Sequence, residues 1–312
     1  MTENSPEYEF ILRDLGHANP AVIVIDAGLA TSMKTHLFAK AFPERYFNLG
    51  IAEQNAVSVA SGLARRELVP LVHTFSNFIA RRAHDQVALS VAWPRCNVKL
   101  IGGSCGVFDG RNGPSHMAID DLATMFALPG MLIVEPGDRR QTRELLHAVV
   151  SHAGPAYLRL RRHGAPEDLL PDLPVDSGVV VAARQENSRA TLVAAGSMLG
   201  EALQATRLLN ESGVPIDLIH VSILRPLHAQ PILESAQRTG LVITLENHVA
   251  SGAFGDAVSR HVAPHGLRHI RFALPDEFIP AGDPRWQLAY CGLDAVAIAD
   301  RVTQLIAEGT NV

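Results

Sequence analysis

Short runs of apolar, β-branched residues alternate with longer stretches of helical periodicity along the chain. In the first half, the apolar runs predict strands at residues 21–25, 69–74, 97–101, 131–134 and 156–160. The stretches between them predict helices at residues 53–66, 77–91, 120–128 and 138–151. Uninterrupted apolar strands separated by helices are typical of a mostly parallel sheet covered by helices on both faces. We therefore predict an α/β fold.

The alternation is interrupted once, at residues 164–178. This segment carries three prolines and four acidic residues, a composition typical of a linker. After it the pattern resumes, with strands predicted at residues 179–183, 191–195, 216–220 and 241–245 and helices at 197–211, 231–238, 251–262 and 293–306. The chain is thus expected to form two α/β domains, residues 1–163 and 179–312, joined by the linker.

Composition narrows the classes of partner. The 312 residues include 27 Lys and Arg against 32 Asp and Glu, a formal charge of −5, which argues against nucleic acid or an anionic membrane as the main partner. Cys96, Cys105 and Cys291 are widely spaced and form no CxxC pair. The polar, acidic start does not read as a signal peptide, and the apolar runs are too short to cross a bilayer. We expect a cytoplasmic protein.

Polar groups follow several of the predicted strands. In open α/β sheets, ligands bind beyond the carboxyl ends of the strands. This rule selects residues 26–28, 74–78, 104–116 and 161–162 of the first domain as loops that converge on one pocket. Glu246–His248 and residues 252–255 occupy similar places in the second domain, with fewer convergent polar groups.

Three features within the first domain could carry chemistry, and each has a purely structural alternative. Glu53 opens a helix after an apolar segment: it either compensates the helix dipole or lies in a dry pocket where it shares a proton with a ligand. Phe75 and Phe78 have ordinary core spacing, but could also form an aromatic wall for a flat ring. His116 follows a turn-rich loop, and is either solvated or catalytic.

A family resemblance favours the chemical alternatives. Residues 47–55, FNLGIAEQN, resemble the NxGIAEQ signature of the transketolase and deoxyxylulose-phosphate synthase family. The similarity is strongest to the separate carboxyl-terminal subunits of split transketolases. It extends through Thr74-Phe75 with Phe78, the GPSH sequence at residues 113–116, RPL at 225–227 and TLENH at 244–248.

The resemblance implies thiamine diphosphate as the cofactor, with its pyrimidine half bound by the first domain. Glu53 would bond the pyrimidine ring nitrogen, a role in which an Asp would be too short and a Gln could not exchange the proton. Phe75 and Phe78 would pack against the ring, and Asp26 would join them as a cofactor-binding residue. His116 would contact the donor substrate near its reacting carbons.

The sequence lacks the GDG motif through which such enzymes hold the diphosphate and its metal. The resemblance therefore implies an N-terminal transketolase subunit that carries GDG and the Mg²⁺ or Ca²⁺ ion, in an assembly predicted to be α2β2. No metal ligand is expected on this chain. The substrate would be a small sugar.

Four positions around the expected substrate site differ from or match the family in informative ways. Asn112 replaces an acidic residue, Ser104 stands where a His is typical, and His73 takes a place usually held by a small residue. Arg162 matches an Arg that pairs with the substrate phosphate, although residues 161–163 could instead form a solvated strand edge. These differences leave open whether the substrate is phosphorylated.

Three functions are compatible with these residues. The first is the carboxyl-terminal subunit of a two-component transketolase, moving a two-carbon ketol unit from a ketose to an aldehyde-type acceptor. The second is the β-subunit of a 2-oxoacid dehydrogenase-type E1, which also lacks GDG and uses a pyrimidine-side Glu. The third is a catalytically silent partner subunit of the same fold, against which the joint presence of Glu53, Phe75 and Phe78 argues.

Overall fold

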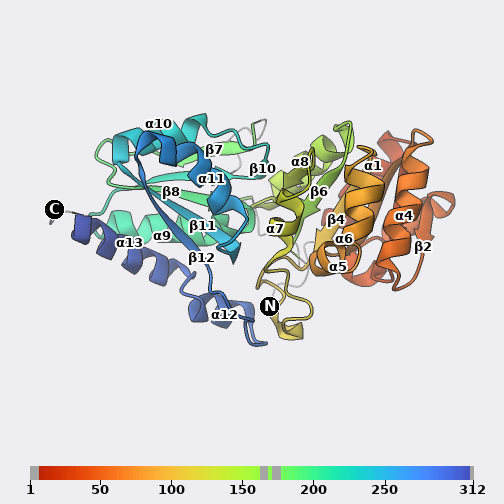
Figure 1. Cartoon of the computed structure of the whole chain (residues 1–312). Coiled ribbons are helices and arrows are strands. Elements are labelled where there is room, and N and C mark those ends of the chain that lie inside the picture. The colour runs from red at the N-terminus through yellow and green to blue at the C-terminus, as the bar shows by residue number, and fades with distance from the viewer. Residues whose placement is uncertain (1–6, 162–167, 171–176, 310–312) are drawn as a thin grey trace.

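The computed structural model describes residues 7–161, 168–170 and 177–309. Two open sheets with packed helices form the two halves of the molecule, the red-to-green first half and the green-to-blue second half in Figure 1. Most neighbouring strands in both sheets run parallel. The predicted α/β fold class is therefore confirmed.

The first sheet has seven strands in the order β10-β5-β6-β4-β3-β1-β2. Its strands are β1 (Val22–Asp26), β2 (Tyr46–Asn48), β3 (Val69–Phe75), β4 (Lys99–Gly103), β5 (Leu132–Val134), β6 (Ala156–Arg159) and β10 (Ile223–Arg225). The central strands are buried along their length, as expected where helices cover both faces. The edge strand β10 comes from the second half of the chain and is antiparallel to β5.

The helices of the first half are mostly short. They are α1 (Glu7–Ala18), α2 (Ala30–Met33), α3 (His36–Ala41), α4 (Glu53–Ala64), α5 (Ser76–Arg81), α6 (His84–Gln86), α7 (Asp121–Phe126) and α8 (Arg139–Ser151). The helix predicted at residues 77–91 is divided into α5, α6 and a π-helical segment, η2 (Val87–Ala92). The division begins where the amides of Arg82 and Ala83 both donate to the carbonyl of Phe78, which changes the hydrogen-bond spacing from four residues to five.

The second sheet has five strands in the order β12-β11-β8-β9-β7. They are β7 (Val179–Ala183), β8 (Thr191–Ala195), β9 (Asp217–Val221), β11 (Leu241–Val249) and β12 (Arg268–Leu274), of which only β7 runs antiparallel to its neighbour. The accompanying helices are α9 (Leu199–Glu211), α10 (Gln230–Thr239), α11 (Phe254–Val262), α12 (Pro284–Tyr290) and α13 (Ala295–Gly309).

Three strands were not predicted from the sequence: β2, β10 and β12. Each lies at the edge of its sheet. Edge strands are partly solvated and carry polar residues, as the half-exposed pattern of β12 illustrates, so they lack the continuous apolar run used to recognise buried strands. β2 and β10 also have only three residues each.

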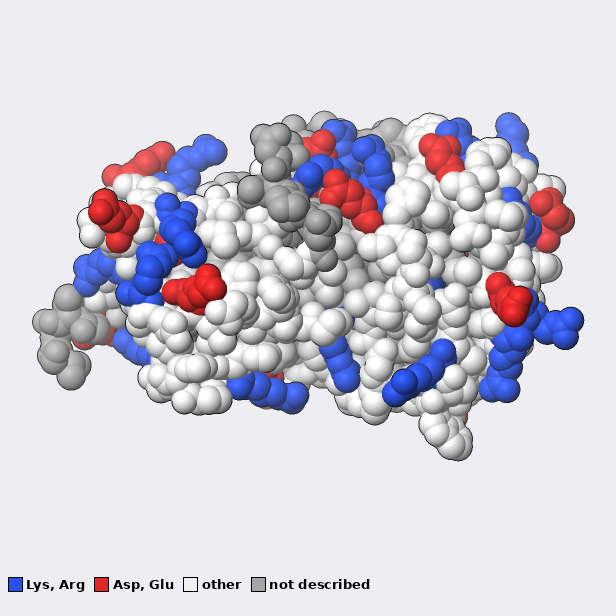
Figure 2. All heavy atoms as spheres, turned by 90° about the horizontal axis from the view of Figure 1, so that it is seen from above, with Lys and Arg blue, Asp and Glu red and all other residues white. Residues whose placement is uncertain are grey.

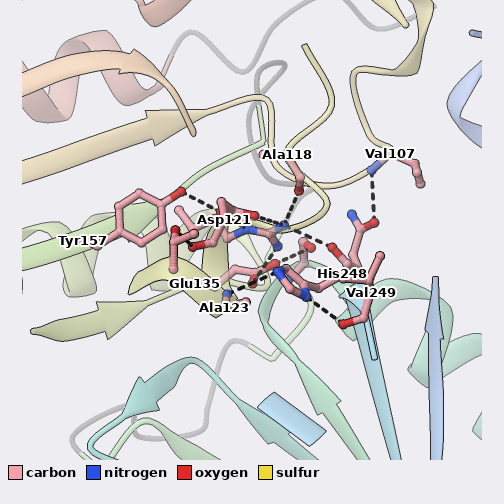
Figure 3. A network of polar contacts seen from close by, with 12 residues as sticks. Val107, Ala118, Asp121, Ala123, Glu135, Tyr157, His248 and Val249 are labelled. Atoms are coloured by element: carbon pink, nitrogen blue, oxygen red, sulfur yellow. Dashed lines mark hydrogen bonds and ion pairs between the residues drawn. The ribbon is translucent and has the colours of Figure 1, made fainter. Parts of the chain in front are cut away.

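A buried polar network joins the two halves (Figure 3). The guanidinium of Arg159, on β6, is fully buried and donates to both oxygens of Asp121 and to Glu135. Its Nη2 atom also donates to the carbonyl of Asn247 on β11, at 3.0 Å. Asn247 in turn accepts from the amide of Val107, so loops of the first half are fixed against the second sheet.

Charged side chains are mixed on the surface. On the face shown in Figure 2, basic and acidic side chains lie interspersed, with uncharged areas between them. In the part of the chain that the structure describes, none of the helices combines the length and the apolar character needed to span a membrane.

Candidate functional site

The candidate residues gather at one edge of the first sheet. β1, β3 and β4 are neighbouring parallel strands that end at Asp26, Phe75 and Gly103. Asp26 pairs in register with His73, and the amide of Leu49, in the segment leading to α4, donates to the Asp26 carbonyl at 2.9 Å. The expected loops therefore do start together, where open α/β sheets bind their ligands.

Glu53 is a buried carboxylate at the first position of α4. Its side chain is 4% exposed, and Oε1 accepts a hydrogen bond from Nη1 of Arg82 at 3.0 Å. The carboxylate adjoins an open pocket of about 420 Å³, which is lined by Ile51, Ala52, Glu53, Gln54, Asn55 and Arg82. The unpaired amides at the start of α4 and the guanidinium of Arg82 thus both lie on the side of the Glu53 carboxyl group.

Phe75 and Phe78 form an aromatic pair on the turn from β3 into α5. Both rings are largely buried, their centroids are 5.7 Å apart, and their planes are tilted by 42°. The guanidinium of Arg82 lies over the Phe78 ring, 4.0 Å from its centroid. Arg82 thus contacts both the Glu53 carboxylate and the Phe78 ring, and so connects the carboxylate to the aromatic pair.

His116 completes this cluster from the loop after β4. Its half-buried ring meets both phenylalanines edge to face, with centroids 5.8 Å from Phe75 and 5.3 Å from Phe78. Its Nδ1 atom lies 2.9 Å from the hydroxyl of Ser115. The side chain of Asn77 donates to the Ser115 carbonyl at 2.8 Å, so α5, which carries Phe78, also holds the His116 loop.

Asp26 and His73 lie deeper, on the strands themselves. Both oxygens of Asp26 accept hydrogen bonds, from the amide of Leu29 and the hydroxyl of Thr35, while burial raises the pKa of the carboxyl. His73 is fully buried, with Nε2 2.7 Å from the hydroxyl of Tyr8. Burial disfavours the charged imidazolium and lowers the His73 pKa to about 4. These two side chains hold the strand ends in place.

Ser104 and Asn112 mark the two ends of the loop that precedes His116. Ser104 is buried, has a left-handed backbone (φ 61°), and donates its hydroxyl to Asp109 at 2.6 Å. A non-glycine residue in this conformation costs free energy that the surrounding packing must offset. Asn112 ends the short helix η3 (Gly110–Asn112), with its side chain exposed to solvent.

The remaining predictions concern phosphate and metal. Arg162, the expected phosphate contact, lies outside the described residues, as does His163. The neighbouring Arg161 stacks its guanidinium 3.8 Å from the centroid of Phe108, and burial lowers its pKa. Within residues 7–161, 168–170 and 177–309, no group of three or more His, Cys, Asp or Glu side chains could hold a metal ion.

Two residues of the cluster were missed by sequence reasoning, Arg82 and Asn77. A signal for Arg82 was available: it follows Phe78 by four residues, the spacing at which side chains meet on a helix. Asn77 is a polar residue between two phenylalanines, and its partner Ser115 is 38 residues away. Such a distant partner leaves no local pattern in the sequence.

The two halves of the chain match two domain models of one enzyme family. Residues 8–167 match the model of the transketolase pyrimidine-binding domain, and residues 179–298 match that of the transketolase C-terminal domain. The chain belongs to the transketolase family, whose members imply thiamine diphosphate as the cofactor.

Individual relatives agree with this assignment. A putative transketolase C-terminal section from Methanocaldococcus jannaschii is 31% identical over 303 residues, covering 95% of this chain and 94% of the relative. A 1-deoxy-D-xylulose-5-phosphate synthase from Geobacter sulfurreducens is 35% identical; this chain spans only 47% of its length. A solved split-gene transketolase, described as an inactive β4 tetramer, is 36% identical, with a TM-score of 0.87 and 97% of each chain covered.

Proposed function

We propose that the chain is the pyrimidine-binding subunit of a two-component, thiamine-diphosphate-dependent transketolase. It would transfer a two-carbon ketol unit from a ketose to an aldehyde-type acceptor. One observation carries the proposal: the buried carboxylate of Glu53 borders an open pocket and is linked through Arg82 to the aromatic pair Phe75 and Phe78. A carboxylate beside aromatic rings suits a flat, nitrogen-containing ring such as an aminopyrimidine.

The residues have separable tasks in this proposal. Thiamine diphosphate, when bound, supplies the carbanion chemistry on which ketol transfer depends. Glu53 would hold a proton at the pyrimidine ring nitrogen, from a carboxyl group whose Oε1 atom also accepts a hydrogen bond from Arg82. Phe75 and Phe78 would pack against the flat pyrimidine ring, and His116, which contacts both of them, would present its imidazole to the substrate.

A partner subunit supplies the other half of the site. This sequence has no GDG motif, so the diphosphate and its Mg²⁺ or Ca²⁺ would be held by an N-terminal transketolase subunit, most simply in an α2β2 assembly. The relative named as a transketolase C-terminal section and the solved split-gene transketolase, described as an inactive β4 tetramer, support this division of labour.

Reconstitution tests the proposal. The chain is produced alone and together with a GDG-containing transketolase chain, and both preparations are assayed for ketol transfer from a panel of ketoses. We expect activity from the pair in the presence of thiamine diphosphate and Mg²⁺, and none from this chain alone. Activity of the isolated chain would contradict the division into subunits. Decarboxylation of pyruvate by the pair, in place of ketol transfer, would assign the chain to the 2-oxoacid dehydrogenase type.

A further inference from the structure

The loop that carries Asn112 and His116 contacts the second domain. In Figure 1 the yellow segment that contains this loop reaches α12, the helix of the second half that lies nearest to it. The amide of Gly282, just before α12, donates to the carbonyl of Gly110 at 3.1 Å. The second domain therefore touches the site through a backbone contact with the loop.

The main side chain at this contact is Gln287, which is completely buried. Its Nε2 atom donates to the carbonyl of Pro280 at 2.7 Å and reaches the Gly110 carbonyl at 3.4 Å and the sulfur of Met117 at 3.3 Å. Its Oε1 atom is buried without a hydrogen-bond partner among the described residues. Burial of an amide group lowers the stability of the fold unless the group makes hydrogen bonds. The contacts that the buried Nε2 atom makes with the loop therefore indicate that Gln287 fixes this loop.

The fit between Gln287 and the loop is sterically strict. A Cβ atom added to Gly110 would lie 1.4 Å from Oε1 of Gln287, so no larger residue fits at position 110 unless Gln287 moves. Two short turns connect Gly110 to His116. The amide of Gly113 donates to the Gly110 carbonyl at 3.1 Å, and the amide of His116 donates to the Gly113 carbonyl at 3.0 Å, so the position of Gly110 influences that of His116.

We propose that Gln287 is a positioning residue through which the second domain sets the place of Asn112 and His116, and hence the binding of the donor ketose. The inference rests on the proposed function only in assigning this loop to the substrate. Gln287 makes none of the contacts described above with Glu53, Phe75 or Phe78, and only His116 connects its loop to the two phenylalanines, so we expect its effect to fall mainly on substrate binding. The second domain thereby acquires a role in the reaction without supplying a catalytic residue.

The first test separates substrate binding from cofactor binding. In the complex reconstituted with the GDG subunit, Gln287→Leu keeps the volume of the side chain and removes its hydrogen bonds. We expect KM for the donor to rise by about tenfold, the effect of losing one to two buried hydrogen bonds, while the Kd of thiamine diphosphate changes by less than about twofold. The matched control Gln230→Leu, on the exposed surface of α10, should leave both constants unchanged. An unchanged KM, or a loss of cofactor affinity equal to the loss of donor affinity, would overturn the proposal.

A double-mutant cycle tests the contact itself. Gly110→Ala alone introduces the clash with Gln287 and should raise the donor KM, whereas Gly110→Ala combined with Gln287→Ala relieves it. We expect the double variant to bind the donor better than Gly110→Ala. Additive losses would refute a direct contact.

Hydrogen exchange gives a readout that does not require turnover. On the full chain without its partner, Gln287→Leu should speed amide exchange in residues 106–119 and leave α4 unaffected. If the wild-type pair shows no ketol transfer, the proposed function fails while this measurement still decides the role of Gln287. Unchanged exchange in residues 106–119 would reject that role.

Discussion

Glu53 is an acidic side chain that is almost completely buried at the edge of an open pocket. Its carboxylate is compensated on one side by the start of α4 and on the other by Arg82, whose side chain is about half exposed (51%). A pair with one solvated member is weak, because water competes for the guanidinium. In the function proposed above, the contact between Arg82 and Glu53 would therefore be exchanged for a hydrogen bond to the ring nitrogen at small cost.

Replacing the carboxylate tests this arrangement most directly. Glu53→Gln keeps the shape of the side chain and removes its ability to exchange a proton. We expect ketol transfer by the reconstituted pair to fall by at least about 100-fold, the usual range for loss of a group that handles a proton. Glu186→Gln, at an exposed position, is the control and should retain full activity. If Glu53→Gln supported ketol transfer at the wild-type rate, the result would favour the alternative that this subunit is catalytically silent.

The buried histidines make stability depend on pH. Burial lowers the pKa of His73 and of His220 to about 4, so both are neutral in the folded protein. Below the ordinary histidine pKa, about 6.5, the unfolded chain binds more protons than the folded chain, and stability is lost as the pH falls from about 6.5 to about 4. Each histidine should lower the free energy of unfolding by about 2 kcal/mol at about pH 5.

Urea unfolding of the chain at several pH values measures this effect. Between about pH 7 and about pH 5, the free energy of unfolding of His220→Gln should fall by about 2 kcal/mol less than that of the wild type, which is the contribution of one buried histidine. His228→Gln, at an exposed site, serves as the control and should follow the wild-type curve. An equally steep curve for His220→Gln would show that this imidazole does not carry the dependence.

At the scale of elements, β10 attaches the second half of the chain to the first sheet. Arg225, its last residue, donates through Nη1 to the carbonyls of Phe126 and Leu128, each at 2.7 Å. These carbonyls lie at the end of α7, where the helix leaves acceptors unpaired and carries a partial negative charge. Arg225 therefore closes α7 and holds the edge strand at the same time.

Removal of this side chain should weaken the whole fold. Arg225→Ala is expected to lower the free energy of unfolding by about 1–3 kcal/mol, since it deletes two charge-assisted hydrogen bonds at a partly buried place. Chemical denaturation followed by circular dichroism gives the value. Arg207→Ala, on the exposed side of α9, should change it by less than about 0.5 kcal/mol. Equal effects of the two substitutions would exclude the role given to Arg225.

Buried strands could be predicted from the sequence, whereas edge strands and contacts between distant residues could not. Buried strands such as β1 and β3 were predictable because their apolar runs are continuous, and the rule of strand ends located Phe75 and His116 on segments that do meet. The edge strand β12 was not predictable, because only some of its side chains are buried and its sequence therefore lacks a continuous apolar run. Gln287 was not predictable either, since its partner Gly110 lies 177 residues away in the sequence.

At the scale of the molecule, the two halves are joined by buried charge. Arg159 lies between Asp121 and Glu135 and also reaches across to the carbonyl of Asn247. Although burial alone would raise the pKa of Asp121, the guanidinium beside it keeps that pKa below its usual range. Asp121 and Arg159 therefore remain charged in the interior, and each depends on the other for stabilisation.

Such a network should make the chain unfold as one unit. Arg159→Met removes the cation but leaves Asp121 and Glu135 buried, so we expect the free energy of unfolding to fall by about 3–5 kcal/mol. Arg184→Met, at an exposed position, is the control. Because the lost contact also connects the domains, denaturation of Arg159→Met should separate into two transitions, detected by different midpoints for probes in the two halves. A single transition with wild-type stability would mean that the domains are held together without this network.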